Sequence, residues 1–74
     1  MTLTEIDAAI IDAIGRYPKK VAMIVGSIGR AAETSHGEDC FDVVASRIAH
    51  LVKSGQLRAA GDISDWRHSE VGPA

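Results

Sequence analysis

Apolar residues recur at helical spacing in three stretches of the chain, separated by segments that contain glycine or proline. In the first stretch they fall three or four residues apart, which predicts an amphipathic helix. These positions are Ile6, Ala9, Ile10, Ala13 and Ile14. Thr2 and Thr4 each precede an acidic residue by three positions, the spacing of the capping box that begins a helix. Gly15 is suited to ending this helix in a left-handed C-cap.

A second helix is predicted after Pro18, because the missing N–H of proline is tolerated in the first helical turn. Its apolar stripe consists of Val21, Ile24, Val25, Ile28, Ala31 and Ala32. Gly26 and Gly29 interrupt the stripe, each costing up to ~1 kcal/mol relative to alanine. They mark either a close helix crossing or the end of the helix after Ile28. A buried strand at residues 21–25 is the less favoured alternative, and polar residues 33–39 are predicted to form a connection.

The third stretch predicts a helix from Cys40 to Ser54, with Gly55 closing it. Asp39 is a good N-cap residue, and Asp42 stands at the reciprocating position. The predicted buried stripe consists of Phe41, Val44, Ala45, Ile48, Leu51 and Val52. The opposite face presents Ser46, Arg47, His50 and Lys53.

A β-hairpin is predicted at the end of the chain, where segments 57–60 and 66–71 flank a loop at 61–65 that is rich in turn-forming residues. Because two strands alone are barely stable in water, the hairpin must lean on the third helix. Leu57 and Trp66 are the predicted anchors. Three helices followed by a two-stranded wing are the layout of a winged helix-turn-helix. The sequence therefore predicts an α+β, mainly helical fold in a single domain spanning residues 1–74.

The domain is small, with 74 residues, and its three aromatic side chains indicate a thin core. A shared interface in a dimer or larger assembly would supplement such a core. No apolar run approaches the roughly 18 residues of a membrane span. The N-terminal stretch is acidic, unlike a signal peptide, and one cysteine permits no internal disulfide. We therefore expect a cytoplasmic protein without a membrane partner.

Charge alternates in sign along the chain rather than concentrating in one basic block. Residues 1–15 carry −3, residues 16–32 carry +4, residues 33–45 carry −4, residues 46–60 carry +3 and residues 61–74 carry −2. A dedicated DNA-binding domain usually has a concentrated basic face. Here only folding could gather the two basic blocks onto one surface.

The segment Gly61-Asp-Ile-Ser-Asp-Trp-Arg-His-Ser-Glu-Val71 resembles the ending of a bacterial winged-helix-like domain of unknown function. That ending reads Gly-Asp-Leu-Ser-x-Trp-Arg-Tyr-Ser-Glu-Val, so Ile63 and His68 are departures from it. The resemblance extends loosely through the third helix and is weaker upstream. It implies a winged-helix fold and a habit of fusion to larger proteins, and it implies no activity or catalytic residue.

The candidate partner contacts lie on the third helix and the predicted wing. They are Ser46, Arg47, His50, Lys53, Arg58 and Arg67, with Lys19 and Lys20 as further phosphate contacts. A winged helix that reads DNA places this helix in the major groove, where arginine pairs with guanine. Acidic residues oppose that interpretation, because Glu38, Asp39 and Asp42 open the helix and two aspartates occupy the wing tip. Ordinary solvated surface charge is the somewhat favoured explanation.

No metal, cofactor or catalytic site is predicted. His36 and Cys40 are four residues apart, but the paired ligands of a structural zinc site are missing. A Cys–His nucleophile at a helix start has no third orienting residue here, and a small packing cysteine is the favoured explanation.

Two hypotheses follow for a non-enzymatic module. The favoured one is protein interaction or self-association on a winged-helix scaffold, and the alternative is a regulator that binds duplex DNA.

Overall fold

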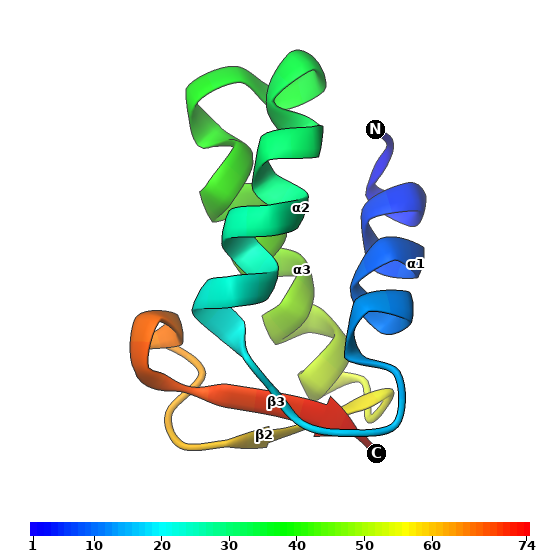
Figure 1. Cartoon of the computed structure of the whole chain (residues 1–74), viewed down its shortest axis with the longest axis vertical. Helices are drawn as coiled ribbons and strands as arrows, with labels where there is room; N and C mark the ends of the chain where they lie inside the picture. Colours follow the sequence, from blue (N-terminus) through cyan, green and yellow to red (C-terminus); the bar gives the residue numbers. More distant parts are fainter.

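The computed structural model describes residues 1–74 and contains three α-helices and a small antiparallel sheet (Figure 1). The helices are α1 (Leu3–Ile14), α2 (Val21–His36) and α3 (Cys40–Lys53). The strands are β1 (Lys19–Lys20), β2 (Leu57–Ala60) and β3 (Glu70–Pro73). Two 3-10 turns complete the chain, η1 (Gly37–Asp39) and η2 (Trp66–His68). The α+β, mainly helical class expected from the sequence is confirmed.

Helix α1 begins as its sequence predicts. The Thr2 hydroxyl accepts a hydrogen bond of 3.1 Å from the Glu5 backbone amide, and the Glu5 carboxylate accepts one of 2.8 Å from the Thr2 backbone amide. This reciprocal pair is the capping box, so Thr2 rather than Thr4 is the N-cap. Gly15 follows the helix with a φ of 61°, which glycine adopts without strain.

The sheet has three strands in the order β1-β3-β2, one more than the predicted hairpin. Lys19 pairs with Val71 and Lys20 with Glu70, while the Val21 amide donates to the Ser69 carbonyl at 3.0 Å. Pro18 therefore precedes a strand, and its predicted place in the first turn of a helix is wrong. The two lysines satisfy backbone groups along the otherwise open edge of β3, which a local helix preference does not reveal.

Helix α2 runs to His36, so the predicted connection at residues 33–39 is wrong for residues 33–36, and only residues 37–39 connect α2 to α3. The helix ends at Gly37, whose φ of 62° lies in the left-handed region that glycine favours. Polar residues on the solvent side do not stop it, and the 3-10 turn η1 leads directly into α3. The alternatives of a strand at residues 21–25 and of an end after Ile28 are also wrong.

Helix α3 differs from prediction at its first turn. Phe41, predicted to be buried, is 40% exposed, whereas Cys40 is buried, in agreement with the packing role expected for it. The buried series Cys40, Val44 and Ile48 sets the helical phase, and Phe41 lies about 100° from it, above Gly29 of α2. Asp39 precedes the helix, but its side chain makes no capping hydrogen bond because η1 continues into α3.

One core joins the helices to the sheet. Its buried members are Ile6, Ile10, Ile14, Val21, Ile24, Val25, Ile28, Ala32, Cys40, Val44, Ile48, Leu51, Leu57 and Val71. Leu57 is thus an anchor of β2, as predicted. The predicted second strand at residues 66–71 is wrong at its start, because Trp66 lies in the 3-10 turn η2 and β3 begins at Glu70. Trp66 packs against the core but is only partly buried. None of the three helices has the length and apolar content that crossing a membrane requires.

Candidate functional site

The outer face of α3 carries a stripe of four residues that we call the α3 stripe. Its members are Asp42, Ser46, Ala49 and Lys53. Their spacing of four, three and four residues keeps them on one side of the helix, opposite buried Val44 and Leu51. Ala49 is half-buried and the other three are exposed. The α3 stripe is acidic at the start of the helix, small in the middle and basic at the end.

Arg47, beside the α3 stripe, is held by α1. Its Nε donates to Asp7 Oδ1 at 2.8 Å, and a terminal guanidinium nitrogen donates to Asp7 Oδ2 at 2.7 Å. Both side chains are roughly one-fifth exposed. The hydrogen bonds from Arg47 lower the pKa of Asp7, and the same contact raises the pKa of Arg47. This paired geometry is the strong form of an arginine–carboxylate contact, so Arg47 is already occupied.

His50 and Lys53 are the basic residues of the last turn of α3, where the positive charge of Lys53 complements the helix dipole. Both are exposed. The ion pairs of the chain are Arg47–Asp7 and His68–Asp65, so Lys53 has no acidic partner within the molecule. Asp42 at the other end of the α3 stripe is equally unpaired.

The predicted wing cations do not join this surface into one patch. Leu57 points into the core, so Arg58 lies on the opposite, solvent face of β2. Arg67 stacks on the ring of its neighbour Trp66, with 4.4 Å between the guanidinium carbon and the ring centroid. Of the six residues predicted as contacts, Ser46, His50 and Lys53 lie exposed on α3, Arg47 lies in an ion pair, and two lie elsewhere.

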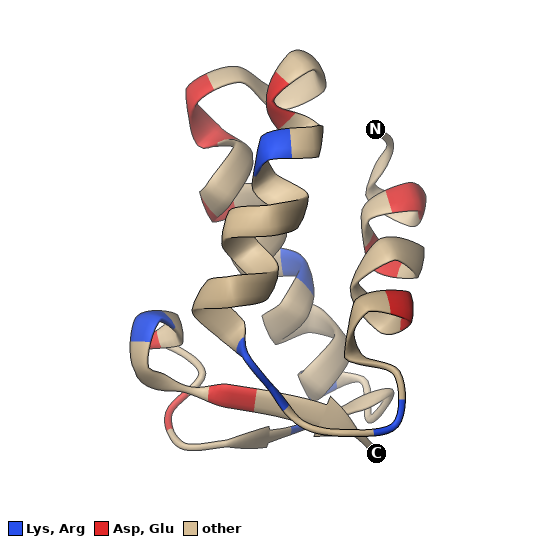
Figure 2. Ribbon diagram, viewed as in Figure 1, with Lys and Arg blue, Asp and Glu red and all other residues tan.

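Acidic residues lie at the end of the molecule where α2 leads into α3 (Figure 2). They are Glu33, Glu38, Asp39 and Asp42. In a helix-turn-helix that reads DNA, the start of the second helix approaches the base edges and phosphates. Negative charge at that position works against the electrostatic attraction that dominates DNA affinity.

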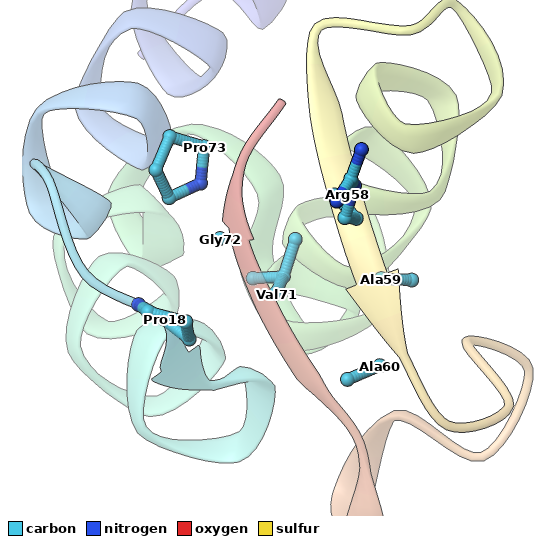
Figure 3. Close-up of a pocket in the computed structure, with 7 residues that line it drawn as sticks. All are labelled: Pro18, Arg58, Ala59, Ala60, Val71, Gly72 and Pro73. Carbon is cyan, nitrogen blue, oxygen red and sulfur yellow. The ribbon is translucent and has the colours of Figure 1, made fainter.

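The surface has three shallow hollows. One of about 110 Å³ lies on the sheet, where Arg58 and Pro73 border a floor of small residues and Gly72 packs under Pro18 (Figure 3). One of about 200 Å³ is polar and is lined by Lys20, Arg67, His68, Ser69 and Glu70. The largest, about 410 Å³, runs beside the α3 stripe and is lined by Leu3, Asp39, Asp42, Val43, Ser46 and Arg47.

The residues that the sequence analysis weighed for metal or nucleophile chemistry lie apart. Cys40 is buried in the core, while His36 Nε2 is 2.9 Å from the Met1 carbonyl oxygen. No three side chains among His, Cys, Asp and Glu gather as a metal ion would require. The structure thus gives Cys40 a packing role and His36 a contact with the start of the chain.

Sequence reasoning missed the partner of Arg47 and the exposed apolar side chains near α3. Asp7 lies forty residues from Arg47 along the chain, and no local spacing connects them. Leu3 is 46% exposed at the edge of the largest hollow, and Val43 lines the same hollow. The position of Val43, one residue after Asp42 and off the buried stripe, was the available signal.

Comparison of the chain with protein-family models, with curated proteins and with solved structures found no match.

Proposed function

We propose that this protein is a small cytoplasmic protein-interaction module on a winged-helix scaffold, with the exposed face of α3 as its contact surface. The order of elements supports the scaffold. Three helices precede a hairpin, and a short strand between α1 and α2 adds to the same sheet. In this proposal the module binds without catalysis, cofactor or metal.

The observation that carries the proposal is the paired contact between Arg47 and Asp7. Arginine is the side chain best suited to reading guanine, and Arg47 is the one arginine of α3. Its donors face a carboxylate of α1 instead of solvent. Moving it to DNA would break two charge-assisted hydrogen bonds and leave Asp7 facing the phosphates.

Partly exposed apolar side chains flank the α3 stripe on both sides and give α3 a second protein-binding feature. Phe41 is 40% exposed, and Val43, Ala45 and Val52 are only partly covered by the core. A DNA-reading surface is polar and strongly positive, whereas a protein interface combines an apolar centre with a charged rim. The mixture on α3 fits the second description.

Binding of duplex DNA is the alternative, and the exposed cations favour it. His50, Lys53 and Arg58 have no acidic partner within the chain. Arg67 is also exposed, although it stacks on Trp66. In this alternative α3 and the wing contact phosphates, and Arg47 must first leave Asp7.

Titration of ¹⁵N-labelled protein with mixed-sequence duplex DNA at low salt separates the two proposals. The interaction module predicts no salt-sensitive shift of backbone amides on α3 or the wing. Shifts confined to those elements that fade as salt rises would replace it with the DNA-binding alternative. The matched variant is His50→Glu with Lys53→Glu, since it reverses the free cations and leaves the Arg47–Asp7 pair in place. Loss of the shifts in that variant would locate the DNA on α3.

A further inference from the structure

The charges of the α3 stripe are arranged so that two copies of it complement each other. Asp42 and Lys53 are eleven residues apart, which is about 16 Å along a helix and close to three full turns. Each is exposed and each lacks an ion-pair partner within the chain. Ser46 and Ala49 lie between them, so the stripe reads acidic, small, small, basic.

We propose that two copies of this protein associate through antiparallel packing of α3 against α3. The spacing of four, three and four residues is the same when the stripe is read in either direction. A two-fold axis perpendicular to the helices therefore brings the four stripe positions of one copy opposite those of the other, in reverse order. Asp42 of each copy then lies opposite Lys53 of the other, and Ser46 opposite Ala49. The contact is isologous and closes with two copies. This inference rests on the proposed function, because it names the partner of the α3 surface.

The middle of the α3 stripe suits a close helix crossing. Ser46 and Ala49 have small side chains, and helix axes approach to the short end of 8–10 Å only where small residues meet. Around this centre lie half-buried Val43, Ala45 and Val52. The crossing therefore covers apolar surface that the monomer leaves partly open.

Parallel pairing is disfavoured by the same charges. It would place Asp42 against Asp42 and Lys53 against Lys53, and like charges across a helix pair oppose association. Arg47 does not disturb the antiparallel pair, because Asp7 already neutralises it.

The dimer should be weak. A stable interface buries ~800 Å² on each partner, and the whole protein exposes 4662 Å². One face of a fourteen-residue helix supplies less than that standard area. We therefore expect dissociation in the micromolar range or above, and a dimer that weakens as salt rises.

Sedimentation equilibrium of the full chain from micromolar to millimolar concentration tests the proposal, with three charge variants. Asp42→Lys gives a stripe with lysine at both ends, and Lys53→Asp gives one with aspartate at both ends. Each should raise its own dimer dissociation constant roughly tenfold or more, where tenfold corresponds to about 1.4 kcal/mol. An equimolar mixture of the two should form a heterodimer, since both end contacts are then attractive. The double variant, with both ends exchanged, should recover the wild-type dimer.

Three outcomes would overturn the proposal. Wild-type protein that stays monomeric up to millimolar concentration excludes self-pairing, while the interaction module itself still stands or falls by the DNA titration. A dimer that ignores both charge variants has its interface elsewhere. A mixture without heterodimer excludes the antiparallel arrangement. A measurement without any variant is the concentration dependence of wild-type amide shifts, which must map to α3.

Discussion

The guanidinium of Arg47 on α3 donates two parallel hydrogen bonds, of 2.8 and 2.7 Å, to the carboxylate of Asp7 on α1. The pair crosses from the first helix to the third, on the side of α3 next to the α3 stripe. It ties α1 to α3 and holds the Arg47 guanidinium against α1.

Replacing Asp7 by Asn should make stability depend on pH in a defined way. The hydrogen bonds from Arg47 lower the pKa of Asp7 in the folded protein from its ordinary 3.8. A lowered pKa means that the charged carboxylate stabilises the fold above pH 3.8, and that this contribution is lost as the pH falls through the lowered value. Urea unfolding should show wild type more stable than Asp7→Asn at neutral pH, with the difference closing in acid. Asp12→Asn, on the same helix but without an ion pair, is the control. A difference that persists unchanged below the lowered pKa would contradict this account.

Gly29 and Phe41 should show a strong energetic coupling. A Cβ added at Gly29 would come within 2.8 Å of Phe41 Cε1, so the ring must move. Alanine is otherwise better than glycine in a helix by about 1 kcal/mol. We expect Gly29→Ala to gain little or to destabilise in wild type, and to gain up to about 1 kcal/mol in the Phe41→Ala background. Unfolding free energies of the four proteins measure the coupling. Equal effects of Gly29→Ala in both backgrounds would show that the ring makes way freely.

Removal of the Ser69 hydroxyl should stabilise the protein. Ser69 is 4% exposed, and its Oγ has no hydrogen-bond partner. A buried polar group without a partner carries a desolvation penalty of roughly 1–3 kcal/mol. Ser69→Ala should therefore raise the free energy of unfolding by about 1 kcal/mol. The control is Ser64→Ala, because the exposed Ser64 hydroxyl is bonded to Asp62 and its loss should not stabilise. A destabilised Ser69→Ala protein would mean that the hydroxyl has a partner in solution.

Truncation of Trp66 should cost less than the ~3 kcal/mol or more that truncating a fully buried aromatic ring costs. The side chain packs only partly against the core, and Arg67 covers its ring. We expect Trp66→Ala to lower the free energy of unfolding by about 2 kcal/mol, between exposed and fully buried truncations. Tyr17→Ala provides the comparison, since Tyr17 is 71% exposed and its loss should change stability little. A loss as large as that of a core residue would place the ring deeper than the structure does.

Much of the helical part of the fold followed from local pattern. Three short-range features of α1 were predicted and are present in the structure. They are the capping box at Thr2, the buried stripe through Ile6, Ile10 and Ile14, and Gly15 after the helix. The end of α2 did not follow, because two glycines inside the helix proved compatible with it and Gly37 outside it set its end. A polar composition at residues 33–36 is an average property, whereas a helix ends where a specific backbone geometry is available.

The features of the candidate site also divide into those that the local sequence predicts and those that the tertiary structure decides. The sequence by itself placed Ser46, His50 and Lys53 on the exposed face of α3, because helical periodicity links spacing to face. It also placed opposite charges at Asp42 and Lys53, eleven residues apart. Only the tertiary structure decided that Arg47 is bound to Asp7, that Arg58 lies on the solvent face of the sheet and that β1 joins β3. These facts depend on contacts between residues far apart in the chain, and such contacts form only when the shared core brings α1, α3 and the sheet together.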